Sequence, residues 1–137
     1  MTKEEASQQI EVFFRRVGLS PLLFEDKNFV KARLGESFLG FEYDASDGLL
    51  SCQALIYRFR REPREEILNA VFAEESSEND HGRIVFESRD FSLYLQRDVA
   101  EKIDDDLFFE QVNQLARASL KWNSEILGQV AEKTVGK

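Results

Sequence analysis

The chain has 137 residues, the length of one domain, and 42% of them are apolar, enough to form a core without disulfides or metals. Its 18 Lys and Arg are outnumbered by 26 Asp and Glu, and the net charge of −8 makes nucleic acid and anionic membranes unfavourable partners. The single cysteine, Cys52, excludes an internal disulfide, and the N-terminus lacks the basic start and apolar stretch of an export signal. We therefore expect one soluble, cytoplasmic domain over residues 1–137.

An amphipathic helix is predicted at the start of the chain. Thr2 and Glu5 have the spacing of a capping box, and the apolar residues that follow recur at helical spacing through Val17. Gly18 is expected to end this helix. The apolar side of the helix needs a covering surface, so it should pack on the rest of the domain.

Apolar and polar residues then alternate with a period of two, which indicates strands. The expected strands cover residues 29–34, 38–43 and 49–59. They are joined by a turn at Gly35 and by a segment rich in turn formers from Asp44 to Gly48. Because these connections are too short for crossovers, the three strands are expected to form an antiparallel meander.

A short helix and two more strands follow. Pro63 suits the first turn of a helix over residues 63–75, and a polar loop should continue to Gly82. Alternation at 84–86 and 91–95 predicts a fourth and a fifth strand around a tight turn at 88–90, with the charged residues 96–100 after the fifth strand.

A long amphipathic helix is predicted near the end of the chain, from about residue 106 to 127, and one residue of the run Asp104, Asp105, Asp106 should cap it. Its broad apolar face consists of Phe108, Phe109, Val112, Leu115, Ala116, Leu120, Trp122, Ile126 and Leu127. The expected fold is therefore α+β in the order α-β-β-β-α-β-β-α, with a five-stranded antiparallel sheet and helices packed on one face.

Residues that could carry out chemistry are few. His81, the only histidine, falls in the polar loop, and Cys52 is in phase with buried residues of the third strand, so neither forms a nucleophile–base pair or a zinc site. The segment from Asp44 to Gly48 has its glycine one position early for a calcium loop and predicts a turn. We expect no catalytic residue, no metal site and no cofactor.

One basic cluster interrupts the acidic chain. It consists of Arg58, Arg60, Arg61 and Arg64. Aromatic residues interleave it, a pattern that can serve nucleic acid, but neighbouring glutamates neutralise most of the charge. We interpret the cluster as surface ion pairs at a strand end and a helix start.

The predicted strands carry more large apolar residues than one buried face requires. Alternation assigns one set, which includes Phe41 and Ile56, to the face beneath the helices. The opposite face then displays Phe29, Phe38, Leu55, Tyr57, Phe59, Val85 and Tyr94. Contiguous exposed apolar patches usually mark interaction sites. Alternation alone leaves open which face is covered, and a dimer partner or the C-terminal tail is the alternative cover.

The order of elements, the size and the acidity resemble the class I type III secretion chaperones of the Tir-chaperone (CesT-like) family over nearly the whole chain. The loose matches are the helix ending at Val17-Gly18-Leu19, the strand ending at Leu93-Tyr94-Leu95, and the last helix with Phe108-Phe109 and Trp122. The resemblance implies a homodimer that binds an effector through an extended N-terminal segment, without ATP or catalytic residues. The related YbjN-like proteins share this fold and have no established secretion role.

The preferred function is a non-enzymatic, chaperone-like protein that holds an extended client segment, for which the resemblance suggests a type III secretion effector. The client is expected on Phe29, Phe38, Leu55 and Tyr57. An alternative is a small regulatory or sensory domain of the same fold with no secretion role. A third is a hydrolase whose acids the sequence does not mark.

A homodimer is expected because the short helix carries apolar residues on more than one side, and the resemblance implies a dimer contact at this helix. The expected contact residues are Ile67, Leu68, Val71 and Phe72.

Overall fold

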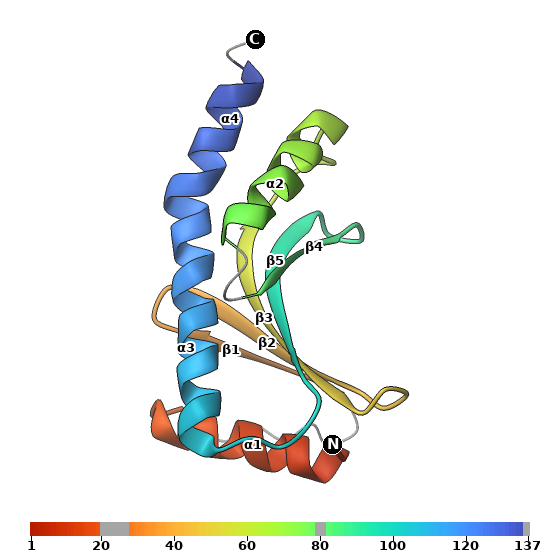
Figure 1. Ribbon diagram of the computed structural model, residues 1–137, viewed down its shortest axis with the longest axis vertical. Coiled ribbons are helices and arrows are strands. Elements are labelled where there is room, and N and C mark those ends of the chain that lie inside the picture. The colour runs from red at the N-terminus through yellow and green to blue at the C-terminus, as the bar shows by residue number, and fades with distance from the viewer. Residues whose placement is uncertain (20–27, 79–81, 136–137) are drawn as a thin grey trace.

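The computed structural model describes residues 1–19, 28–78 and 82–135. In chain order it contains α1 (Lys3–Arg16), β1 (Phe29–Leu34), β2 (Ser37–Asp44), β3 (Leu49–Arg58), α2 (Glu65–Glu78), β4 (Arg83–Glu87), β5 (Ser92–Val99), α3 (Asp105–Lys121), a π-helical turn (Trp122–Ile126) and α4 (Leu127–Val135). The last three run on as one long helix (Figure 1). The predicted α+β class and order of elements are confirmed.

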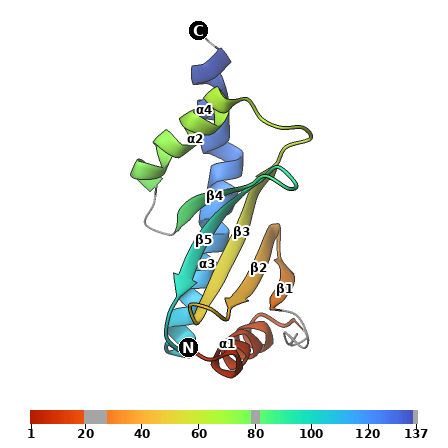
Figure 2. The ribbon, with the colours of Figure 1, turned by 90° about the vertical axis from the view of Figure 1, so that its right-hand side faces the viewer.

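The five strands form one antiparallel sheet in the order β1-β2-β3-β5-β4. The first three strands form the predicted meander. The connection through α2 then carries the chain to the far edge, so that β5 returns between β4 and β3. Helix α3 lies along one face of the sheet. Helix α1 crosses the N-terminal end of α3 (Figures 1 and 2).

Helix α1 begins and ends as its sequence predicts. The Glu5 amide donates to Thr2 Oγ1 at 3.1 Å and the Thr2 amide donates to Glu5 Oε1 at 2.9 Å, which completes the capping box. After the helix, Gly18 adopts a φ of +80°, a conformation that favours glycine. Local backbone and side-chain contacts therefore define both ends of α1.

Four phenylalanines form the centre of the core between α1, α3 and β2. The Phe41 ring lies 5.8 Å from both Phe13 and Phe14, and Phe108 lies 6.0 Å from Phe13 in an edge-to-face contact. All four side chains are at most 2% exposed. Ile56 is also buried, so the covered face is the one that alternation assigned to the core.

Several predicted boundaries were wrong. Helix α2 starts at Glu65 and not at Pro63, and it continues to Glu78 through residues expected to form a loop. Phe91 belongs to the hairpin turn and not to the fifth strand. It has a φ of 59°, which the reversal of the chain requires, and its carbonyl accepts from the Phe59 amide at 2.9 Å. Strand β5 instead runs from Ser92 and includes most of the charged residues expected after it.

Leu120 was also assigned wrongly, because it is 39% exposed rather than part of the buried face of the last helix. The buried stripe of α3 passes through Ser119, and the next residue lies about 100° further around the helix. Leu120 therefore points away from the sheet.

A buried glutamine that the apolar pattern did not reveal joins α1 to the start of α3. Gln9 is 1% exposed; its Nε2 donates to Asp105 Oδ1 at 3.3 Å, and its Oε1 accepts from the Ile103 amide at 3.1 Å. The N-cap of α3 lies beside this contact. Asp104 accepts from the amides of Asp106 and Leu107, as predicted for one of the three aspartates. This contact fixes the loop after β5 against α1.

Two backbone irregularities face each other where the long helix passes β3. Ile56 is an extra residue in the strand, because Leu55 pairs with Tyr94 and Tyr57 pairs with Leu93. The Ile56 carbonyl accepts a 2.8 Å hydrogen bond from Nδ2 of Asn123, which lies in the π-helical turn. The side chain of the turn thus satisfies a carbonyl at a point where the strand ladder is interrupted.

Candidate functional site

The sheet face that the helices leave open carries the residues predicted to bind a client. Phe38 is 51% exposed and Tyr57 is 42% exposed, whereas Phe29 and Leu55 are half-buried. Phe29, Phe38 and Leu55 line one hollow of about 260 Å³ together with Tyr94. We call the surface defined by Phe29, Phe38, Leu55 and Tyr94 the open face.

Tyr57 is separated from the other three residues. It follows the β-bulge at Ile56, and its ring contacts Phe59 in an edge-to-face arrangement at 4.9 Å. Both rings line a different groove, next to α2 and α4. The sequence could not reveal this separation, because simple alternation places Tyr57 in line with Leu55.

A glycine allows the Phe29 ring to approach the backbone of β2 closely on the open face. Gly40 lies in β2 opposite Lys31, and a Cβ atom built on it would be 3.0 Å from the Phe29 ring. An alanine at this position would force the ring to move. Phe29 therefore covers the backbone of the neighbouring strand and becomes part of the floor of the hollow.

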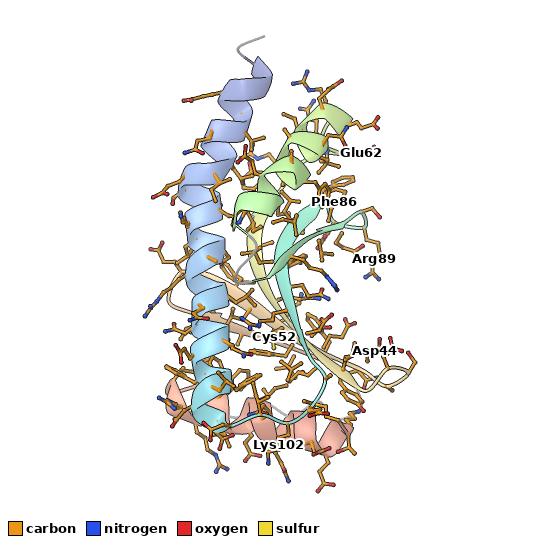
Figure 3. All side chains as sticks on the ribbon, viewed as in Figure 1. Asp44, Cys52, Glu62, Phe86, Arg89 and Lys102 are labelled. Atoms are coloured by element: carbon orange, nitrogen blue, oxygen red, sulfur yellow. The ribbon has the colours of Figure 1, made fainter. Side chains whose placement is uncertain are left out.

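A second hollow of about 490 Å³ shows that the open face is concave. Its lining comes from both edges of the sheet, with Phe29 and Lys31 from β1 and Val85 and Glu87 from β4. In Figure 3, Arg89 extends from the β4–β5 hairpin into the space between that hairpin and the opposite end of the sheet. The open face is therefore bounded on two sides, by β1 and by the β4–β5 hairpin.

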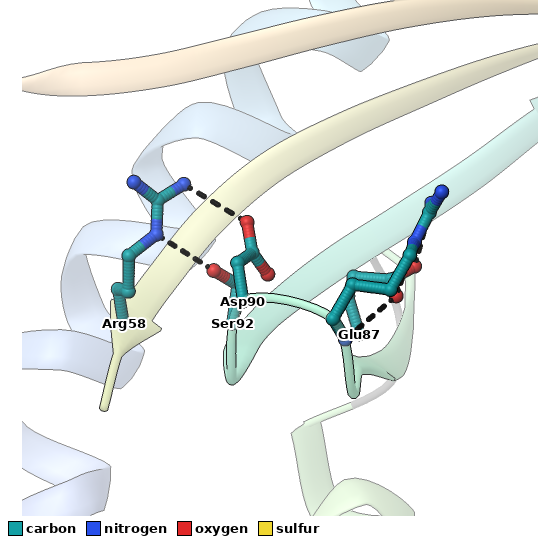
Figure 4. A network of polar contacts seen from close by, with 5 residues as sticks. Arg58, Glu87, Asp90 and Ser92 are labelled. Atoms are coloured by element: carbon teal, nitrogen blue, oxygen red, sulfur yellow. Dashed lines mark hydrogen bonds and ion pairs between the residues drawn. The ribbon is translucent and has the colours of Figure 1, made fainter. Parts of the chain in front are cut away.

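Most charges at the rim of the open face are already paired. Arg58 donates to Ser92 Oγ at 2.9 Å and lies 3.3 Å from Asp90, while Arg89 contacts Glu87 at 2.9 Å (Figure 4). The hydrogen bond from Arg89 lowers the pKa of the Glu87 carboxyl. These pairs fix the hairpin and neutralise its rim.

Two cations on β1 differ from those at the rim. Lys31 and Arg33 are exposed and form no ion pair with any described residue. Their charged groups lie instead over aromatic rings, Lys31 at 5.7 Å from the centre of Phe29 and Arg33 at 5.2 Å from that of Phe38. The open face thus has an uncompensated positive edge on a chain of net charge −8.

The residues weighed for chemistry do not form a reactive site in the described part of the chain. Cys52 is buried, and burial raises the pKa of its thiol to about 12, so it stays neutral. Asp44 accepts from Ser46 and Asp47, as in a turn, and these bonds lower the pKa of its carboxyl. No group of three potential metal ligands occurs among the described residues. His81 lies outside them.

Helix α2 presents the expected dimer residues to different surroundings. Val71 is fully buried within the protomer and is unavailable to a partner, which leaves Ile67, Leu68 and Phe72 as the expected contact residues. Ile67 and Leu68 are half-buried, and Phe72 is 38% exposed. Beside the start of α2 lies a largely apolar groove of about 700 Å³, walled by Tyr57, Phe59, Arg60, Arg61, Ile67, Leu127 and Val130 among others.

The basic cluster borders this groove, and only part of it is paired. Arg58 contacts Asp90, and Arg64 lies 4.0 Å from Glu66. Arg60, Arg61, Glu62 and Glu65 form no ion pair with any described residue. The expected network of surface ion pairs is therefore incomplete in a single protomer.

The sequence matches no known protein family and no curated protein, whereas the fold matches solved structures. A chain of the ExsC–ExsE complex superposes with a TM-score of 0.73 at 11% identity, over 90% of this chain and 94% of that one. A chain of the HopA1–SchA chaperone–effector complex gives 0.67 at 14% identity, over 88% and 94%. A chain of the ExoU–SpcU complex from the type III secretion system of Pseudomonas aeruginosa gives 0.57 at 15%, over 87% and 95%.

None of the helices in the described ranges is long and apolar enough to cross a membrane. The structural matches extend over nearly the whole length of the chains compared, and identities of 11 to 15% establish the fold alone. The chain has the α+β fold of the type III secretion chaperones, as its sequence predicted.

Proposed function

We propose that this protein is a non-enzymatic, homodimeric binding protein that holds an extended segment of a client on the open face of its sheet. The observation that carries the proposal is a concave face that holds exposed Phe38 beside half-buried Phe29 and Leu55, while the opposite side of the sheet is already packed. The similar folds come from a chaperone–effector complex and from a type III secretion system, which supports a secretion effector as the client.

An extended segment suits this face better than a folded surface. The sheet ends at β1 and β4 with unpaired strand edges among the described residues, and the hollows of the open face lie between these edges. An extended chain can satisfy its backbone groups at such an edge while alternate side chains enter apolar hollows. Phe38 is the most exposed aromatic residue of the open face and is the expected anchor.

The dimer is supported by α2 and by the charges beside it. Phe72 is exposed on α2, and the adjacent groove is apolar. In a two-fold interface the same surface occurs on both subunits, so Arg60 and Arg61 of one protomer could pair with Glu62 and Glu65 of the other. Such pairing would complete the network that one protomer leaves incomplete.

Client binding is tested by capture from the native cell. A tagged protein carrying Phe38→Asp and Leu55→Asp should lose a protein that the wild type retains, because two apolar contacts are replaced by charges. Leu120→Asp is the matched control, since Leu120 is an exposed leucine on the far side of α3. Equal capture by the double variant, with its urea midpoint unchanged, would place the client elsewhere.

The dimer is tested by light scattering at tens of micromolar. Wild type should have about twice the 15.9 kDa of the chain, and Phe72→Glu should lower the mass to that of one chain. Leu120→Glu is again the control, because its exposure of 39% matches the 38% of Phe72. A wild-type mass of 15.9 kDa would refute the dimer.

One observation favours a second function, a small regulatory or sensory domain without a secretion role. The groove beside α2 has about 700 Å³, the size of a small-molecule site, with an apolar wall and arginines at its mouth. A monomer in solution, combined with capture of a signalling enzyme in place of a secreted protein, would support this alternative.

A further inference from the structure

The backbone groups of β1 that face away from the sheet belong to three identifiable residues. The Tyr43 amide donates to the Asn28 carbonyl at 2.8 Å, which makes these two residues a hydrogen-bonded pair. Bonded and non-bonded pairs alternate along an antiparallel ladder, so Val30 and Ala32 also bond to β2. The N–H and C=O groups of Phe29, Lys31 and Arg33 therefore point to the free edge.

The same alternation sorts the side chains of β1. Lys31 and Arg33 lie on the open face and are exposed. Ala32 and Leu34 lie on the side of the core and are only half-buried, so this edge of the core is incomplete. A strand that extended the sheet would place every second side chain beside the two cations and the others beside Ala32 and Leu34.

Residues directly opposite each other on neighbouring strands share a face and interact, and opposite charges in such positions are favourable. We propose that the client segment along β1 alternates acidic and apolar residues, with two carboxylates opposite Lys31 and Arg33. This proposal rests on the proposed client-binding function and adds the chemistry of the segment. The apolar residues between the carboxylates would cover Ala32 and Leu34.

The net charge of −8 does not oppose this arrangement strongly. At physiological ionic strength the Debye length is about 8 Å, so exposed charges far from β1 are screened. The acids of the hairpin, Glu87 and Asp90, already contact Arg89 and Arg58, so they do not compensate Lys31 and Arg33. Glu42 is the acidic neighbour on β2, opposite Phe29, and it favours an apolar client residue there.

The test uses three fluorescent nine-residue peptides with Val at alternate positions and Asp, Ser or Lys between them. Fluorescence anisotropy should show the Asp peptide binding about fivefold to tenfold more tightly than the Ser peptide, from two exposed ion pairs. The Lys peptide should bind most weakly. With ¹⁵N-labelled protein, the Asp peptide should shift the amide signals of Phe29, Lys31 and Arg33, whose N–H groups it would bond.

Charge reversal provides the decisive comparison. The double variant Lys31→Glu, Arg33→Glu should prefer the Lys peptide to the Asp peptide. The control Arg117→Glu, Lys121→Glu makes the same change in net charge on α3, which packs on the sheet face opposite the open face, and should keep the preference for Asp.

The outcomes separate this proposal from the one on which it rests. Equal binding of the three peptides, binding that the double variant of β1 does not change, or no binding at all overturns the proposed client chemistry. In each of these cases the client-binding function still stands, provided that the wild type captures a client and the variant with Phe38→Asp and Leu55→Asp loses it. Capture that those two substitutions leave unchanged overturns client binding on the open face itself.

Discussion

The strongest test of the structure compares two phenylalanines of β2 that point to opposite faces of the sheet. Phe41 is 0% exposed and contacts Phe13 and Phe14, so Phe41→Ala should lower the free energy of unfolding by about 3–5 kcal/mol. Phe38 is 51% exposed. Phe38→Ala loses about half of the burial energy of a phenylalanine and its contact with Arg33, about 1–2 kcal/mol in total.

The difference of about 2.5 kcal/mol is measurable by urea unfolding. Trp122 is the only tryptophan and is 1% exposed, so its fluorescence reports loss of the core. With a slope of about 2 kcal/mol per molar urea, the two midpoints should differ by about 1.2 M. All variants must be compared at one protein concentration, because a dimer links stability to concentration. Equal destabilisation by the two substitutions would show that the open face is in fact covered.

Three further predictions follow from contacts inside the protomer. Gln9→Leu should cost about 1–3 kcal/mol in urea unfolding, because it leaves the Ile103 amide without its partner. Asn123→Leu should cost a similar amount by removing the donor to the Ile56 carbonyl, whereas Asn123→Asp, which keeps the size but not the donor, should not restore the loss. Cys52 should react with a thiol reagent at pH 8 only on unfolding. Because its folded pKa is about 12, above that of the unfolded thiol, stability should fall between pH 9 and 12 in the wild type and less in Cys52→Ala.

The sequence predicted the features that depend on local pattern. The capping box at Thr2, the stop at Gly18 and the alternation through β1, β2 and β3 each rest on neighbouring residues, and all three are confirmed. Alternation showed which residues share a face with Phe41. That the helices cover this face and not the opposite one became clear only from their packing in the structure.

The features that the sequence missed depend on contacts between distant parts of the chain. Gln9 is polar and was not recognised as buried, because its partners lie more than 90 residues away. Tyr57 left the row of Phe38 and Leu55 because of a bulge that period-two alternation does not register. The sequence could not show that Lys31 lacks an ion pair, because the folded sheet decides which acids lie near which cations. The acids of the hairpin contact Arg58 and Arg89.

The bulge at Ile56 and the π-helical turn at Asn123 have a consequence for how this chain can change in evolution. Insertions normally accumulate in loops, yet here a strand and a helix each contain an irregularity at the same height of the domain. Trp122, Ile126 and Val130 are all buried although they are spaced four residues apart. In a regular α-helix each step of four residues would turn the side chain about 40° further around the axis. We therefore expect one-residue deletions in β3 and in the long helix to be tolerated together more readily than singly, so that the lengths of these two elements are inherited as a pair.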